Sequence, residues 1–186
     1  NGRGLARSSI LKHPHEKDSG RTSSITHHYF KNDKCDLIFV DLAGHEKYYK
    51  TTIHGINSGL VDYAILLVGS NMGVLRMTKE HLGVIKALNI PFFIVFTKID
   101  ICPPNILERN MFEIKNILNK NFKKYSFDIN NYTNCSNNLI KIFQLSNVSG
   151  KGLNEFRTFL SNLDNLPLKI SNSIVKNNEK IFWIEE

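Results

Sequence analysis

The fold is decided by residues 62–100, which read DYAILLVGSNMGVLRMTKEHLGVIKALNIPFFIVFTKID. Two apolar runs within it, Tyr63–Val68 and Ile90–Phe96, have the length of buried strands and are far too short to cross a bilayer, and the first strand is predicted at Asp62–Val68. Between them, Met77–Leu88 has apolar residues at helical spacing, and Thr78 is its predicted cap. Near-continuous apolar strands joined through a helix are typical of a parallel sheet that helices cover on both faces.

The same alternation extends outward from this stretch in both directions. It predicts strands at Leu37–Val40 and Leu139–Leu145 and helices at His45–Leu60, Pro103–Phe122 and Leu153–Leu163. Residues 1–35 are polar and have no sustained apolar period, so they are predicted to be mostly loop with one short helix. Residues 126–138 are rich in Asn and are predicted to form a surface insertion.

The bulk composition limits the class of protein. A length of 186 residues suits one domain, and no run approaches the about 20 apolar residues of a membrane span, so no membrane partner is expected. Three separate cysteines without CxxC spacing, at positions 35, 102 and 135, indicate a reduced, cytoplasmic protein. The net charge of +7 leaves two interpretations open, a solvated basic surface or attraction to RNA or the ribosome.

The residues that follow the predicted strands are the first candidates for a site, because ligands of such folds bind beyond the carboxyl ends of the strands. The first strand is followed by DLAGH at 41–45. Asp41 can hold a magnesium ion through water, and Gly44 lets its backbone N–H approach a phosphate. His45 is placed to orient a water molecule for attack. A tight turn with a satisfied histidine is the alternative, since DxxG is common by chance.

Two further strands are followed by polar motifs, TKID at 97–100 and SNVSGKG at 146–152. The Asp100 carboxylate can accept two hydrogen bonds from guanine, and the aliphatic stem of Lys98 can lie over the base. The Ser-led turn can offer a backbone N–H to the guanine carbonyl. Exposed charged turns are the alternative for each motif alone. Three motifs in this order, each at a predicted strand end, predict a guanine-nucleotide site, and Asp100 disfavours an adenine nucleotide.

These motifs closely resemble the GTP-binding domain of translational GTPases, especially the family of GTP-binding protein 1 and GTP-binding protein 2. The likeness is carried by DLAGHEKYYKTT at 41–52, by the stretch at 66–107 that begins LLVGSNMG, and by QLSNVSGKGL at 144–153. The opening NGRGLARSSILKHPHEKDSGRTSSI at 1–25 is similar to that family's first switch region. The resemblance implies an α/β, P-loop NTPase-like GTPase domain, with a mostly parallel sheet flanked by helices.

The resemblance also implies roles for single residues. Thr22 matches the switch-I threonine that contacts magnesium and the γ-phosphate, and Asp41 matches the switch-II aspartate of the magnesium site. Gly44 matches the glycine that contacts the γ-phosphate, and His45 the histidine that positions the attacking water. The remaining matches are the guanine-specificity motif, at Thr97, Lys98 and Asp100, and the last base-contacting loop, at Ser146, Asn147 and Val148. Position 97 is Thr where most GTPases carry Asn.

The sequence departs from the family at one point, because no GxxxxGK[ST] phosphate-binding loop occurs in it. In the family this loop lies just upstream of the stretch that matches residue 1. The resemblance therefore implies a GTP-binding domain at 1–168 that is N-terminally incomplete, lacking the loop and the first strand. Residues 169–186, with a predicted strand at Lys180–Ile184, are expected to begin a following β-barrel domain.

The implied function is a molecular switch that hydrolyses GTP to GDP and phosphate with magnesium, as elongation factors do. The implied partners are the guanine nucleotide and the ribosome, tRNA or mRNA-decay machinery, and no DNA is expected. The alternative is a non-catalytic interaction domain that keeps the sheet and the switch surfaces without binding nucleotide tightly. The missing loop favours this alternative, whereas the complete set Thr22, Asp41, His45 and Asp100 opposes it.

Overall fold

A computed structural model of the chain describes residues 13–19, 22–31, 36–58, 61–122, 126–128 and 139–163. Its main sheet has the strand order β3-β4-β6-β5, and every neighbouring pair is parallel. The strands are β3 (Ala64–Gly69), β4 (Phe92–Thr97), β5 (Ser126–Asp128) and β6 (Leu139–Gln144). The predicted α/β architecture with a parallel sheet is therefore confirmed.

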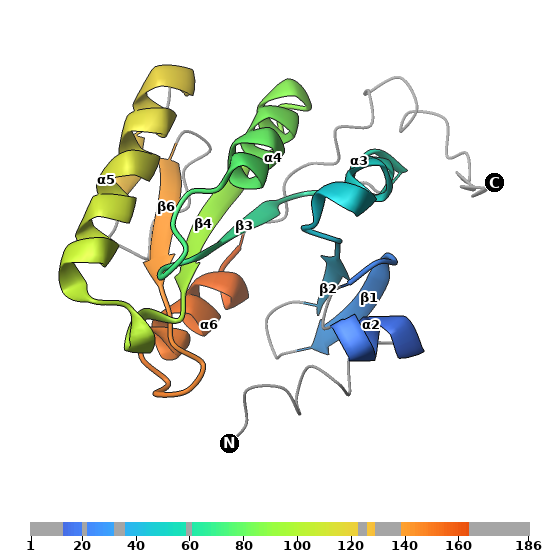
Figure 1. The fold of residues 1–186 in the computed structure, drawn as a ribbon, viewed down its shortest axis with the longest axis horizontal. Helices are drawn as coiled ribbons and strands as arrows, with labels where there is room; N and C mark the ends of the chain where they lie inside the picture. Colours follow the sequence, from blue (N-terminus) through green and yellow to red (C-terminus); the bar gives the residue numbers. More distant parts are fainter. Residues whose placement is uncertain are drawn as a thin grey trace.

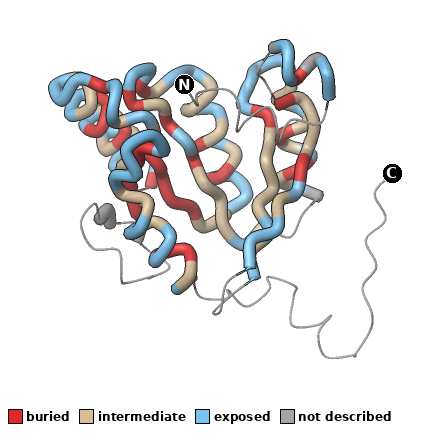
Figure 2. The backbone as a smooth tube through the Cα atoms, turned by 90° about the horizontal axis from the view of Figure 1, so that it is seen from below, coloured by how far each residue is buried: buried red, intermediate tan, exposed pale blue. Residues whose placement is uncertain are grey.

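Strand β4 lies inside the sheet and explains why its sequence has no polar alternation. Residues 92–96 are all buried, since β4 is paired on both edges and covered on both faces. Among the described strands, β3 pairs with β4 alone; it is only partly buried, and its Leu67 is 64% exposed. Figure 2 shows the buried residues gathered along the strands of the sheet and on the sides of the helices that face it.

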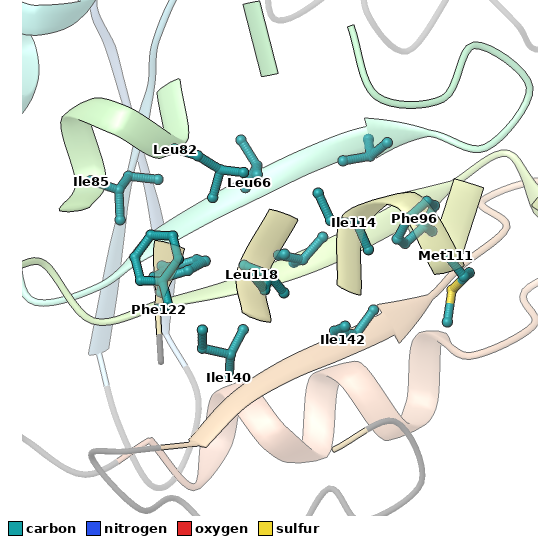
Figure 3. Packing of buried hydrophobic residues seen from close by; sticks show 13 residues of the cluster. Leu66, Leu82, Ile85, Phe96, Met111, Ile114, Leu118, Phe122, Ile140 and Ile142 are labelled. Carbon is teal, nitrogen blue, oxygen red and sulfur yellow. The ribbon is translucent and has the colours of Figure 1, made fainter. Parts of the chain in front are cut away.

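Helices α4 (Arg76–Ala87) and α5 (Pro104–Asn121) cover one face of the sheet (Figure 1). Their apolar stripes pack on alternate residues of the strands, and Figure 3 shows Ile114 and Leu118 of α5 inserted among them. Both side chains are fully buried. Truncating either to Ala should cost about 2–5 kcal/mol of unfolding free energy.

Helix α6 (Leu153–Ser161) covers the opposite face with an aromatic cluster. Phe159 packs between Phe93 and Phe143, with ring centroids 5.1 and 4.8 Å away. Leu37 and Phe39, which belong to β2 (Asp36–Asp41), pack against the same cluster. Strand β2 is thus joined to the main sheet through this apolar face.

Strand β1 (Thr26–Lys31) is a correction to the prediction of loops over residues 1–35. It pairs antiparallel with β2, with Thr26 opposite Asp41, in a separate two-stranded sheet (Figure 1). The sequence THHYFK gives no apolar alternation because most of the strand is exposed. The short helix expected in this region is confirmed as α2 (Pro14–Ser19).

The remaining element boundaries differ from the predictions in detail. The helix predicted at His45–Leu60 is a 3₁₀ turn, η1 (Glu46–Tyr48), followed by α3 (Tyr49–Ser58), and a second 3₁₀ turn, η2 (Ile99–Ile101), follows β4. Thr78 accepts a hydrogen bond from the Leu75 N–H at 3.2 Å, which caps α4 from its first turn. The insertion predicted at 126–138 is wrong at its start, because β5 extends the sheet there. A three-residue strand is too short to show periodicity.

Several predictions concern residues outside the described ranges. These are the rest of the Asn-rich insertion, the domain boundary after residue 168, and the strand at Lys180–Ile184. Among the described helices, none combines the length and apolar character that a membrane span needs.

Candidate functional site

The carboxyl ends of β3, β4 and β6 lie side by side, so the loops that follow them are neighbours. Gly69 is level with Thr97, and Phe96 is level with Gln144. Beyond the strands, the Leu145 N–H donates to the Phe96 carbonyl at 2.7 Å, and the Ile99 N–H donates to the Leu145 carbonyl at 3.3 Å. The two predicted base-binding motifs are therefore brought together by backbone hydrogen bonds.

The contact between these loops is a hydrogen bond from Ser146 to Asp100. The Ser146 hydroxyl donates to Asp100 Oδ1 at 2.8 Å, and the serine is completely buried. The same hydroxyl oxygen accepts hydrogen bonds from the backbone N–H groups of Val148 (3.2 Å) and Ser149 (3.1 Å). One serine thus orients the carboxylate and closes its own turn, while Asn147 and Val148 are exposed at the turn's tip.

Lys98 holds a strained backbone conformation directly after β4. Its φ and ψ are 60° and 36°, in the left-handed region that a residue with a Cβ rarely adopts. The residue is exposed, whereas the preceding Thr97 is half-buried and its carbonyl accepts the Ser70 N–H at 2.9 Å. The turn at Lys98 leads the chain from the sheet into η2, which carries Asp100.

The loop after β6 contains two glycines with positive φ, Gly150 at +77° and Gly152 at +75°. A Cβ on Gly152 would lie 2.2 Å from the carbonyl oxygen of Gln144, whereas a Cβ on Gly150 would meet nothing within 4 Å. The second glycine therefore allows the chain to pass close over the end of β6 before α6 begins.

The sequence did not predict a buried polar cluster at Ser70, Cys102 and Asn110. This cluster supports the base side of the site, meaning the loops after β4 and β6 that carry the two predicted base-binding motifs. The Ser70 carbonyl accepts hydrogen bonds from Asn110 Nδ2 at 2.8 Å and from the Cys102 thiol at 3.1 Å. Asn110 is 3% exposed, and its side chain fills the space where a Cβ on Gly73 would lie. A single Asn in an apolar helical stripe gives no sequence signal for this role, and Cys102 had no predicted role.

The phosphate-side candidates lie around the end of β2. Thr22 is buried, and its hydroxyl donates to Asp41 Oδ2 at 3.4 Å. The two residues are 19 positions apart, and the pairing of β1 with β2 brings them together. The structure therefore places the two predicted magnesium-contacting side chains in contact with each other.

Gly44 and His45 lie on the exposed turn that follows. A Cβ on Gly44 would meet nothing within 4 Å, so space is open beside its backbone. The His45 ring caps η1, where its Nδ1 accepts the Lys47 N–H at 3.2 Å. A neutral imidazole that accepts at Nδ1 carries its proton on Nε2, so the other ring nitrogen is a donor. Thr52 of α3 holds this turn through hydrogen bonds to the carbonyls of Ala43 and Tyr48.

Helix α4 contacts the segment that follows this turn. Arg76 and Glu46 form an exposed ion pair at 3.6 Å, which contributes little in water. The His81 ring packs on Tyr49 of α3, with centroids 5.8 Å apart. Burial lowers the pKa of His81 below its ordinary value, against an opposing effect of Glu80, and its Nε2 has no hydrogen-bond partner within the described part of the chain.

A parallel sheet covered on both faces, with polar loops gathered beyond its strands, defines an α/β domain of the kind that binds ligands at the carboxyl ends of its strands. Comparison with protein families gives a match over residues 3–167 to the family described as Elongation factor Tu GTP binding domain. The chain belongs to this family, whose members form an elongation-factor-like, GTP-dependent switch domain.

Individual relatives agree with this assignment. The chain is 38% identical to GTP-binding protein 1 of Xenopus laevis over 195 residues, which cover 87% of the chain and 30% of that protein. It is 36% identical to GTP-binding protein 2 of Homo sapiens over 192 residues, covering 87% and 32%. Among solved structures, a bacterial selenocysteine-specific elongation factor EF-Sec matches with 25% identity and a TM-score of 0.66, covering 89% of the chain and 28% of that structure. The chain thus spans about a third of the length of these relatives.

Proposed function

We propose that the chain is the nucleotide-binding part of a longer GTPase that binds GTP through Asp100 and hydrolyses it with the help of His45. The observation that carries the proposal is the Ser146–Asp100 hydrogen bond at 2.8 Å, which orients a carboxylate at the carboxyl end of the sheet. Guanine presents two adjacent N–H donors on one edge, and a carboxylate with two oxygens can accept both. Adenine presents a different pattern there, so the pair favours guanine.

The other base-side residues support the same ligand. Lys98 follows β4 directly and is exposed, and its long aliphatic stem is suited to covering the face of a base. The tip of the Ser146 turn, at Asn147 and Val148, would contact the opposite edge of the base. Thr97 would contribute as the last residue of β4, which leads the chain into the turn at Lys98.

Thr22 and Asp41 suit a magnesium ion that accompanies the phosphates. Their hydroxyl and carboxylate oxygens lie 3.4 Å apart and are the hard oxygen ligands that magnesium prefers. In the described ranges, no group of three or more His, Cys, Asp or Glu could hold a metal ion. Two protein oxygens fit magnesium, which usually keeps several waters and binds mainly to substrate phosphates. Such an ion would neutralise charge on the β- and γ-phosphates.

The backbone N–H of Gly44 and the ring of His45 would act on the γ-phosphate side. Because Nδ1 of His45 accepts the Lys47 N–H, a neutral ring presents its Nε2–H as a donor that can hold a water molecule. This arrangement orients the nucleophile rather than removing its proton. Loss of the γ-phosphate would release Thr22 and Gly44 and change the surface that a partner sees.

The partner we propose is the ribosome or a ribosome-bound RNA, in the cytoplasm. The net charge of +7 is suited to a polyanionic surface. The similarity to a selenocysteine-specific elongation factor of Haemophilus influenzae, 32% identical over 155 residues, supports a role in translation.

The test uses the full-length protein that contains this chain, with ribosomes as stimulant. GTP and GDP should compete with a fluorescent guanine nucleotide, and ATP should not. His45→Ala should lower stimulated hydrolysis about 100-fold, while the Kd for GTP changes less than twofold. His54→Ala, on the exposed side of α3, is the matched control and should leave both unchanged. A Kd that rises as much as hydrolysis falls would remove the catalytic role from His45, and a folded protein that binds no guanine nucleotide would favour the interaction domain.

A further inference from the structure

Glu16 of α2 is a completely buried carboxylate that hydrogen bonds to the segment carrying Thr22. Its Oε1 accepts from both the backbone N–H and the hydroxyl of Ser23 at 2.7 Å, and from the same two groups of Ser24 at 3.1 Å. Its Oε2 accepts the His13 N–H at 3.2 Å. One side chain thus accepts hydrogen bonds from His13, which precedes it, and from Ser23 and Ser24, which follow it.

The carboxylate is held in its charged form by these donors. The hydrogen bonds from Ser23, its backbone N–H first, and those from His13 and Ser24 outweigh the effect of burial and hold the pKa of Glu16 far below its ordinary value. Glu16 therefore keeps its negative charge at physiological pH. A charged acceptor binds N–H and O–H donors more strongly than a neutral one does.

The hydrogen bond to the Ser23 N–H affects Thr22, because Ser23 directly follows Thr22 in the chain. The Ser23 N–H belongs to the peptide unit that joins Thr22 to Ser23, and a peptide unit is planar and trans. Fixing that N–H also fixes the direction of the Thr22 carbonyl, on the other side of the same plane. The Thr22 hydroxyl is at the same time 3.4 Å from Asp41 Oδ2. The Thr22 hydroxyl is thus bonded to Asp41, while the peptide unit that follows Thr22 is bonded to Glu16 through the Ser23 N–H.

We propose that Glu16 is a positioning residue for Thr22, which it holds in the conformation needed to contact the γ-phosphate and magnesium. The inference rests on the proposed function. GDP has no γ-phosphate, so the position of Thr22 matters more for GTP than for GDP. Glu16 therefore sets the preference for GTP over GDP without touching either nucleotide.

The experiment compares Glu16→Gln with Asp18→Asn in the full-length protein. Asp18 lies on the same helix and is exposed, and Asp18→Asn replaces a carboxylate by an amide as Glu16→Gln does. Affinities for GDP and for a non-hydrolysable GTP analogue are measured with magnesium, together with hydrogen exchange of the Ser23 and Ser24 amides. Glu16→Gln should weaken the GTP analogue about tenfold and GDP less than twofold, with faster exchange at both amides. Asp18→Asn should change neither quantity.

The outcomes separate this inference from the proposed function. If the unaltered protein binds no guanine nucleotide, the proposed function fails and the role of Glu16 fails with it. If the unaltered protein binds both nucleotides but Glu16→Gln weakens them equally, or weakens neither, only the positioning role is overturned. Should Glu16→Gln fail to fold, Ser23→Ala removes one of the donors and should shift the same affinity ratio about threefold. An unchanged ratio in Ser23→Ala would also overturn the inference.

Discussion

The base-side loops after β4 and β6 and the phosphate-side segments around Thr22 and His45 are held by different kinds of contact. The base side rests on backbone hydrogen bonds between strand ends, such as Leu145 N–H to Phe96 carbonyl at 2.7 Å, and on buried groups below them. The phosphate side is held by side chains, with the Thr22 hydroxyl on Asp41 and the His45 ring on η1. Side-chain contacts of this kind can be exchanged for contacts to a ligand, whereas breaking the strand-end contacts would disrupt the sheet. In the proposed function, the domain would therefore combine a fixed site for the base with an adjustable site for the phosphates.

The largest effect should follow from breaking the rigidity of the base side at Gly152. Gly152→Ala places a Cβ 2.2 Å from the Gln144 carbonyl oxygen and retains a positive φ. We expect a loss of about 3 kcal/mol of unfolding free energy, measured by urea denaturation. Gly150→Ala has nearly the same φ and open space, so it should cost only about 1 kcal/mol. Equal losses in the two variants would mean that the close approach to β6 contributes nothing.

A smaller effect is expected on nucleotide affinity when Asp100, on the base side, is changed. Asp100→Asn replaces a charged acceptor by an amide, and losing charge-assisted hydrogen bonds to guanine should cost about 2–3 kcal/mol, or about 100-fold in Kd. Because a fixed base site makes the same contacts to both ligands, GTP and GDP should weaken by the same factor in a competition titration. Glu108→Gln, an exposed change on α5, is the control. Unequal weakening would show that the base site also responds to the γ-phosphate.

The smallest effect concerns His81, where α4 meets the phosphate side. Its folded-state pKa is lowered by burial, so the neutral ring is the form that fits against Tyr49. The neutral His81 ring contributes its full stability above the unfolded-state pKa of about 6.5. This stability is lost as the pH falls below that value, and the loss is complete once the pH is below the folded-state pKa.

Urea midpoints measured between pH 7.5 and 5.5 test this behaviour. His81→Phe keeps an aromatic ring and cannot titrate, so its midpoint should fall less with acid than that of the unaltered protein. His54→Asn removes an exposed histidine of α3 and should keep the original dependence. An identical pH dependence in His81→Phe and the unaltered protein would contradict the assignment.

The sequence was most informative where apolar pattern and structure coincide. Residues 92–96 are apolar because they are buried on both faces, so β4 could be predicted, and with it the order of motifs beyond the strands. Strand β1 could not be predicted, because its side chains are mostly exposed and its stability comes from pairing with β2. Pairing of distant segments leaves no local pattern.

The same distinction applies to the candidate site. Asp41, Asp100 and Ser146 stand at strand ends and could be picked out from a strand prediction, although their roles in binding remain a prediction. Glu16 and Asn110 could not be found in this way. Each is a buried polar residue on a helix, and its role depends on hydrogen-bond partners three to 40 positions away. Which backbone groups such a side chain meets is decided by the folded structure and not by its neighbours in sequence.

The contact between Gly73 and Asn110 has a consequence for how this domain can vary. The Asn110 side chain occupies the volume that a Cβ at position 73 would need, at 2.7 Å from its Oδ1, while its amide supports the Ser70 carbonyl. A side chain at 73 would need a smaller residue at 110 and would also have to adopt a φ of +70°, so position 73 is closed to most substitutions. Related sequences that have drifted here should have changed both positions together, and in between they must have passed through a less stable intermediate.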